Sequence, residues 1–271
     1  MAQTILPILE AYTLTLSAPI KPGAIHRFIT SSEYEIRLVE MVSVIPFLEE
    51  AFSRGEALAR GSIDARMLGL GAITGKAMVS AYERTEVRPL SGLIASMIAA
   101  SAAYGYYRGL DKISPPEALR RIAKYLYSSP PEDSIALIRA LEAVAERDLI
   151  LLLDRNRITP SRIELEGIRL GDVYEVLSAI DKGFSINLRG INNIIELRSE
   201  IANSSNIVEG IVRAFIRLLP PKFKPVRLDP KELLRIDRSL TDRRFTRLLG
   251  PVGAATALVL FSEPPTLPRP S

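Results

Sequence analysis

The sequence has no cysteine, no tryptophan, one histidine and one glutamine among its 271 residues. Without cysteine the chain cannot form disulfides, bind zinc or an iron–sulfur cluster through thiolates, or use a cysteine nucleophile. Because His26 is the only imidazole, any site that needs two histidines from one chain is excluded. A Ser-His-Asp hydrolase would have to use His26, and the Gly-x-Ser-x-Gly motif that would accompany it is missing. Much catalytic chemistry is therefore excluded.

The remaining composition is that of a soluble globular protein, with 47% apolar and 24% charged residues. The basic residues are mostly arginine and thermolabile side chains are scarce, which favours a heat-adapted source. The N-terminal stretch lacks the basic region of a signal peptide and contains Glu10. The apolar stretch 252–261 is far shorter than the roughly 20 residues that span a bilayer. We therefore expect a cytoplasmic protein without a membrane segment.

Apolar residues recur at three- and four-residue spacing through most of the chain, which predicts α-helices. The predicted helices cover residues 4–16, 34–54, 62–84, 90–108, 115–127, 132–153, 171–181, 190–203, 206–219, 229–237 and 240–249. Residues 90–108 are rich in small side chains and carry no charge before Arg108, which predicts a buried helix. The expected fold is all-α, a helical bundle of about ten helices around a small-residue-rich central helix.

Charge and proline divide the expected bundle into two parts. Residues 1–220 are predicted to form the all-α domain, and residues 221–271 a basic helical C-terminal extension with a Pro-rich tail. Residues 222–247 carry a net charge of +5, whereas the whole chain carries only +4. This segment is interpreted either as a basic arm for nucleic acid or for the phosphates of a CoA-like ligand, or as a pair of solvated helices. Its two aromatic residues are few for base stacking.

The densest group of polar residues lies in the loop at residues 17–28. Prolines and Gly23 favour a rigid turn there, and this turn would bring Lys21, His26 and Arg27 close together. Arginine binds phosphate through a planar fork and lysine adds a point charge, so the loop is a candidate phosphate site. The alternative is a helix connection whose charges face water.

The pattern Ala-Pro-x-Lys-Pro-Gly-x-x-His-Arg-Phe at residues 18–28 resembles the opening motif of the triphosphoribosyl-dephospho-CoA synthase family in its archaeal form. Residues 145–150, Ala-Glu-Arg-Asp-Leu-Ile, resemble a second segment of that family, Ala-x-Arg-Asp-x-Ile-Ala. Helix order and spacing are similar over residues 5–220. Members of the family are all-α bundles that join ATP to dephospho-CoA through a ribosyl bond and release adenine.

The resemblance implies a site that binds a nucleotide or a CoA-type small molecule, with Mg²⁺ accompanying ATP. The residues expected to bind substrate and phosphate are Lys21, Pro22, Gly23, Arg27, Arg88 and Arg147. The residues expected to act in catalysis are Asp148 and His26. Further carboxylates that could support the reaction are Glu83, Glu86 and Asp154. From spacing alone, Arg147 and Asp148 also fit an exposed charge couple on a helix.

The chain departs from the family at the start of the central helix. Where the family carries Asn-Thr-x-x-Gly, this sequence reads Arg-Pro-Leu-Ser-Gly at residues 88–92, so only Gly92 is retained. Three hypotheses follow. The protein is a nucleotide-dependent transferase, a catalytically degenerate helical homologue that binds or regulates, or a nucleic-acid-associated protein that uses its basic C-terminal segment.

Overall fold

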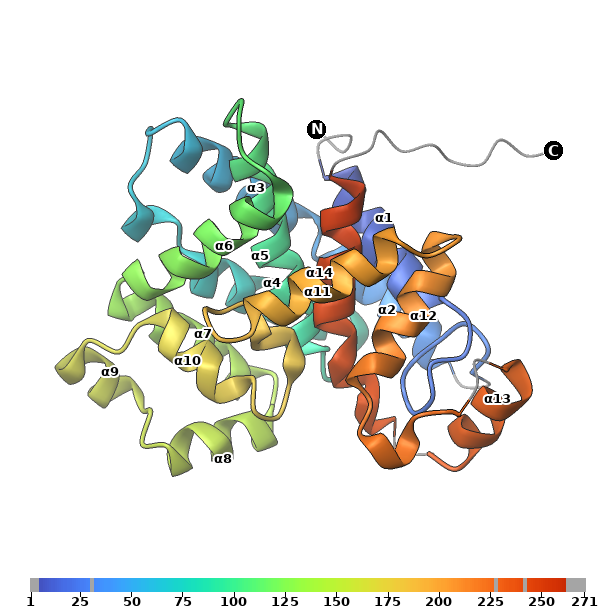
Figure 1. The fold of residues 1–271 in the computed structure, drawn as a ribbon. Helices are drawn as coiled ribbons and strands as arrows, with labels where there is room; N and C mark the ends of the chain where they lie inside the picture. Colours follow the sequence, from blue (N-terminus) through green and yellow to red (C-terminus); the bar gives the residue numbers. More distant parts are fainter. Residues whose placement is uncertain (1–4, 30–31, 227–228, 241–242, 262–271) are drawn as a thin grey trace.

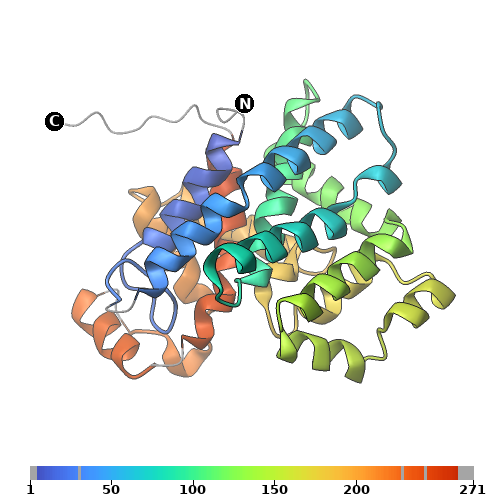
Figure 2. The same ribbon diagram turned by 180° about the vertical axis from the view of Figure 1, so that it is seen from behind.

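The computed structural model describes residues 5–29, 32–226, 229–240 and 243–261 (Figures 1 and 2). These ranges contain fourteen α-helices, short 3₁₀ helices and no strand, which confirms the predicted all-α class. The first seven α-helices are α1 (Leu6–Ser17), α2 (Glu33–Ser43), α3 (Ile45–Ala59), α4 (Leu70–Thr85), α5 (Ser91–Arg108), α6 (Pro115–Tyr125) and α7 (Pro131–Ala143). The others are α8 (Arg147–Arg155), α9 (Pro160–Glu166), α10 (Leu170–Leu177), α11 (Ile191–Ala202), α12 (Ile207–Leu218), α13 (Pro230–Arg238) and α14 (Leu249–Leu260).

Helix α5 is the centre of the bundle, as the sequence predicts, and fifteen of its eighteen residues are buried. Small residues let α3 approach it closely. A Cβ atom added to Gly105 would lie 1.9 Å from the carbonyl oxygen of Phe52 in α3. The Ser101 hydroxyl donates a hydrogen bond to the carbonyl of Leu48 at 2.7 Å, so it has a partner despite complete burial.

Helix α14 is a second buried helix and packs against α1, α5 and α11. Figure 1 shows it in red beside the blue α1. Ser96 of α5 is hydrogen-bonded to the Tyr12 hydroxyl at 2.6 Å and donates to the Gly250 carbonyl at 2.8 Å, which ties the three helices together. The chain after residue 220 therefore completes the core and is not simply an extension of it. The Pro-rich tail lies outside the described residues.

Two long predicted helices are each divided in the structure. The predicted helix 34–54 becomes α2 and α3, because Pro46 lacks an N–H group and lies in the first turn of a new helix. The predicted helix 132–153 becomes α7 and α8, since Ala145 has a positive φ of 55° between them. This second break leaves Glu146 buried just before α8.

Residues 62–84 are also divided, because Gly69 adopts a left-handed conformation just before α4. The η6 segment (Arg244–Leu248), a 3₁₀ helix, precedes α14, where a single helix at 240–249 is predicted.

None of the helices within the described ranges is both long and apolar enough to cross a membrane.

Replacing Gly105 with alanine is expected to lower the free energy of unfolding by about 1–3 kcal/mol, because the added methyl group would overlap the Phe52 carbonyl. Urea denaturation measures this change. Ser53→Ala on the exposed side of α3 is the control, with an expected change below about 0.5 kcal/mol. A Gly105→Ala variant as stable as the control would contradict the close approach of α3 and α5.

Candidate functional site

A cleft of about 510 Å³ opens beside the N-terminal end of α5. Charged residues from separate parts of the chain line it. The arginines are Arg37 of α2, Arg88 before α5, and Arg243, Arg244 and Arg247 from the segment before α14. The acids are Glu33, Glu146, Asp148 and Asp181. This arrangement combines cations that suit phosphate with carboxylates that suit hydroxyl groups or a developing positive charge.

Three buried carboxylates from separate elements meet the first residues of α5. They accept hydrogen bonds from three consecutive residues: Glu40 from the Leu90 N–H at 2.8 Å, Glu146 from the Ser91 hydroxyl at 2.8 Å, and Asp181 from the Gly92 N–H at 3.2 Å. A helix N-terminus has N–H groups without intrahelical partners and a partial positive charge, so it favours nearby anions. Burial nevertheless raises the pKa of all three carboxyl groups, to about 6 for Asp181.

Several of the cleft arginines lie beside carboxylates. Arg37 Nη1 donates to Glu40 Oε2 at 2.7 Å, Arg247 Nη2 donates to Asp148 Oδ2 at 3.1 Å, and Arg88 Nη1 lies 3.8 Å from Glu146 Oε2. Arg88 and Asp148 are the two predicted site residues that line the cleft. Both are more than half exposed, so their ion pairs are open to solvent and to a ligand.

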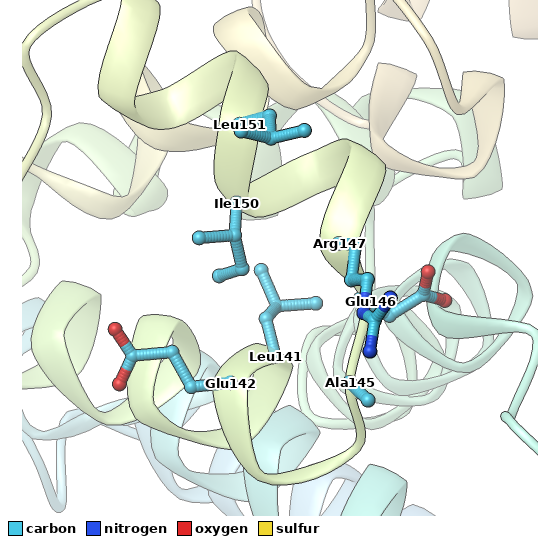
Figure 3. A pocket seen from close by; sticks show the side chains of 7 residues that line it. All are labelled: Leu141, Glu142, Ala145, Glu146, Arg147, Ile150 and Leu151. Atoms are coloured by element: carbon cyan, nitrogen blue, oxygen red, sulfur yellow. The ribbon is translucent and has the colours of Figure 1, made fainter.

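A second hollow, of about 400 Å³, lies between α7 and α8 and shares Glu146 with the cleft (Figure 3). Its walls are largely apolar, with Leu141 and Ile150 facing one another across it. The carboxylate of Glu146 turns away from these side chains. Arg147, predicted to bind phosphate, lines this hollow and not the cleft, because Arg147 and Asp148 point in different directions from the first turn of α8.

Lys21 does not line the cleft. Its side chain is fully buried, and Nζ donates hydrogen bonds to the carbonyls of Leu16 and Ala18, at 3.2 and 2.7 Å. Both carbonyls lie at the C-terminal end of α1, where the C=O groups of a helix lack intrahelical partners. Burial, helped by the nearby Arg27 guanidinium, lowers the pKa of Lys21 to about 7. In this structure Lys21 caps α1 and is not exposed to a phosphate.

The other predicted loop residues also lie away from the cleft. Pro22, Gly23 and His26 are buried, and Arg27 is exposed. The Gly23 N–H donates to Asp237 Oδ1 at 2.9 Å, and His26 Nε2 lies 3.3 Å from Asp237 Oδ2. Gly23 has a φ of 69°, a conformation that glycine adopts without strain. The motif residues therefore hold the loop against α13.

The loop at residues 17–28 helps to hold residues 243–247, the segment that carries three of the cleft arginines. Asp237 also accepts a hydrogen bond from Arg243, and the Ile25 N–H donates to Thr246 Oγ1 at 3.2 Å. Burial raises the pKa of Asp237, but hydrogen bonds from His26 and Gly23 outweigh it and hold the pKa below its ordinary value. The segment that resembles the family motif thus positions Arg243 and Thr246, which do line the cleft.

The carboxylates in the cleft are mostly not those that the sequence suggested. Glu83, Glu86 and Asp154 are exposed and do not line it, whereas Glu146 and Asp181 do. Within the described ranges no group of three or more carboxylate or imidazole side chains is arranged to hold a metal.

Comparison of the chain with protein-family models, with curated proteins and with solved structures gives no match. The resemblance to the triphosphoribosyl-dephospho-CoA synthase family therefore stays a prediction from the sequence, made on residues 18–28 and 145–150 and on helix order.

Replacing Lys21 with methionine is expected to change the pH dependence of stability. Lys21 has a pKa of about 7 when folded and an ordinary value when unfolded, so above pH 7 the unfolded state binds more protons. The free energy of unfolding of the wild type should therefore rise between pH 7 and 10, relative to the variant, by about 1 kcal/mol per pH unit. Urea denaturation at several pH values measures both slopes. Equal slopes would contradict the burial of this ammonium group.

Proposed function

We propose that the protein is a nucleotide-dependent transferase that binds ATP in the arginine-rich cleft. The observation that carries this proposal is the presence of five arginines from separate parts of the chain in one cleft, above buried carboxylates. Guanidinium groups bind phosphate oxygens in a bidentate manner and stay charged at every physiological pH. Three of the five arginines belong to the basic segment 222–247, which supports a phosphate-binding role for part of that segment.

The resemblance to the triphosphoribosyl-dephospho-CoA synthase family supplies the proposed reaction. A hydroxyl oxygen of the acceptor forms a bond to C1′ of the ATP ribose while the bond from C1′ to adenine breaks. The hydroxyl proton leaves with a base, and adenine departs after taking up a proton. Arg88 and Arg247 would neutralise the triphosphate, and Asp148 would stabilise positive charge that develops on the ribose. His26 has no role in this scheme because it is buried against Asp237.

The apolar hollow beside the cleft supports a CoA-type acceptor. Leu141, Ile150 and Leu151 would contact an uncharged arm of the acceptor while its phosphates remain near the arginines. Mg²⁺ would enter with ATP, since the chain does not offer a metal-binding cluster among its described residues. No step of the proposed reaction is assigned to a bound metal.

A second candidate function is nucleotide binding without turnover. Two observations favour it. Arg88 and Pro89 replace the Asn-Thr pair of the family, and Asp181 already uses one oxygen on the Gly92 N–H and the other on the Gly183 N–H. Because both of its oxygens accept backbone hydrogen bonds, Asp181 is less available to stabilise positive charge on a ribose. This candidate predicts ATP binding with no release of adenine.

A nucleic-acid partner is less well supported than a small ligand. Phe223 and Phe245, the aromatic residues of the basic segment, pack edge-to-face at 5.2 Å, and Phe245 is buried. They therefore offer little surface for stacking with bases. Arg243 and Arg247 of the same segment are hydrogen-bonded to Asp237 and Asp148.

ATP is expected to raise the melting temperature of the full chain, and Arg88→Ala or Arg247→Ala should weaken ATP binding roughly tenfold or more, because each removes a charge-assisted hydrogen bond. Calorimetric titration measures the affinity, and chromatography detects adenine after incubation with ATP and dephospho-CoA. Arg120→Ala on the exposed side of α6 is the matched control and should bind ATP normally. Lack of ATP binding would contradict both candidate functions, whereas binding without adenine release would leave the second.

A further inference from the structure

Glu146 has a buried oxygen atom without a hydrogen-bond partner. The left-handed conformation of Ala145 ends α7 and directs the chain inward, and only 4% of Glu146 is exposed. Oε1 accepts the hydroxyl of Ser91, but Oε2 makes no hydrogen bond, and Arg88 is 3.8 Å away. Buried polar atoms nearly always make a hydrogen bond, so a carboxylate oxygen in a cleft wall that makes none is a candidate acceptor for a ligand donor.

The charges around Glu146 decide which ligand group fits. The groups that act on it from the neighbouring elements are Arg88, Arg247, Asp148, Asp181 and Glu40. Three of these five carry negative charge when ionised, so a phosphate oxygen beside Oε2 would be repelled. A hydroxyl group would instead donate a hydrogen bond to Oε2. Phosphates and a hydroxyl donor occur side by side in phosphorylated sugars.

We propose that Glu146 accepts a hydrogen bond from a sugar hydroxyl of a ligand whose phosphates lie on the cleft arginines. The ligand class is then a nucleotide or another phosphorylated sugar, and inorganic polyphosphate lacks the group that Glu146 recognises. This inference rests on the proposed binding of ATP and adds the residue that distinguishes a nucleotide from a bare phosphate chain.

The test compares four probes on the full chain by calorimetric titration: ATP, 2′-deoxy-ATP, 3′-deoxy-ATP and inorganic triphosphate. The wild type should bind ATP roughly tenfold or more tightly than at least one of the deoxy analogues, because a hydrogen bond to a charged acceptor is lost. In Glu146→Gln this ratio should fall to about threefold or less, since the acceptor is then neutral. Binding of triphosphate should not weaken in this variant.

Two controls separate this role from a structural one. Glu132→Gln removes an exposed carboxylate in the first turn of α7, which lines neither the cleft nor the hollow, and should keep the wild-type ratio. In the wild type, the ratio of ATP to deoxy analogue should fall when the pH is lowered through the pKa of Glu146, which burial raises above its ordinary value. Taking a ratio cancels the titration of the phosphates, which the probes share.

Three results would overturn the inference. Equal binding of ATP and both deoxy analogues, with triphosphate still bound, would show that the ligand does not use a sugar hydroxyl here. Full discrimination in Glu146→Gln would assign the hydroxyl to another residue. If neither ATP nor triphosphate binds, the proposed function fails, and the inference fails with it.

Discussion

The meeting of three buried carboxylates with the first residues of α5 is the interaction on which the rest of the structure depends. Glu40, Glu146 and Asp181 come from separate elements and bond to three consecutive residues. They supply hydrogen-bond partners that the buried N-terminal end of α5 cannot obtain from water. Gly92 is required for this contact, because a Cβ atom there would lie 2.0 Å from Asp181 Oδ1.

The same interaction gives the cleft its charge. Buried carboxylates need nearby cations, and Arg37, Arg88 and Arg247 lie close enough to supply them or to pair with their neighbours. The segment before α14 adds Arg243 and Arg244 to the same cleft. Hydrogen bonds from the loop at residues 18–29 to Asp237 and Thr246 hold this segment in position. The packing of the core and the electrostatics of the cleft are therefore consequences of one arrangement.

Much of the fold could be predicted from the sequence, because helical periodicity and the small residues of α5 are local signals. The division between α7 and α8 could not, since Ala145 adopts a positive φ although it is not glycine. The predicted helices do not include α14, because its stretch is apolar all round and has no polar face that would mark a helical period. Its Ala- and Gly-rich composition, like that of α5, is the signal that could have revealed it.

Less of the candidate site could be predicted. Asp148 could be predicted because it lies in the segment 145–150 that resembles the family, and Arg88 because it is a basic residue where the family carries asparagine. The three carboxylates at α5 were not, because the hydrogen bonds that define them join residues 50, 55 and 89 positions apart. The sequence predicts Lys21 as a phosphate ligand because a charged residue in a loop is usually exposed. Only the three-dimensional packing reveals that it caps α1. The basic segment was visible in the sequence, but not the direction of its arginines.

The central claim is that the arginines beside α5 form a nucleotide-phosphate site, and a crystal structure of the full chain grown with ATP tests it most directly. We expect the triphosphate between Arg88 and Arg247, with the ribose beside Glu146. The opposite result is a triphosphate bound to exposed side chains of α13 or of the loop at residues 18–29, while the cleft arginines keep their hydrogen bonds to carboxylates. This result would contradict the claim.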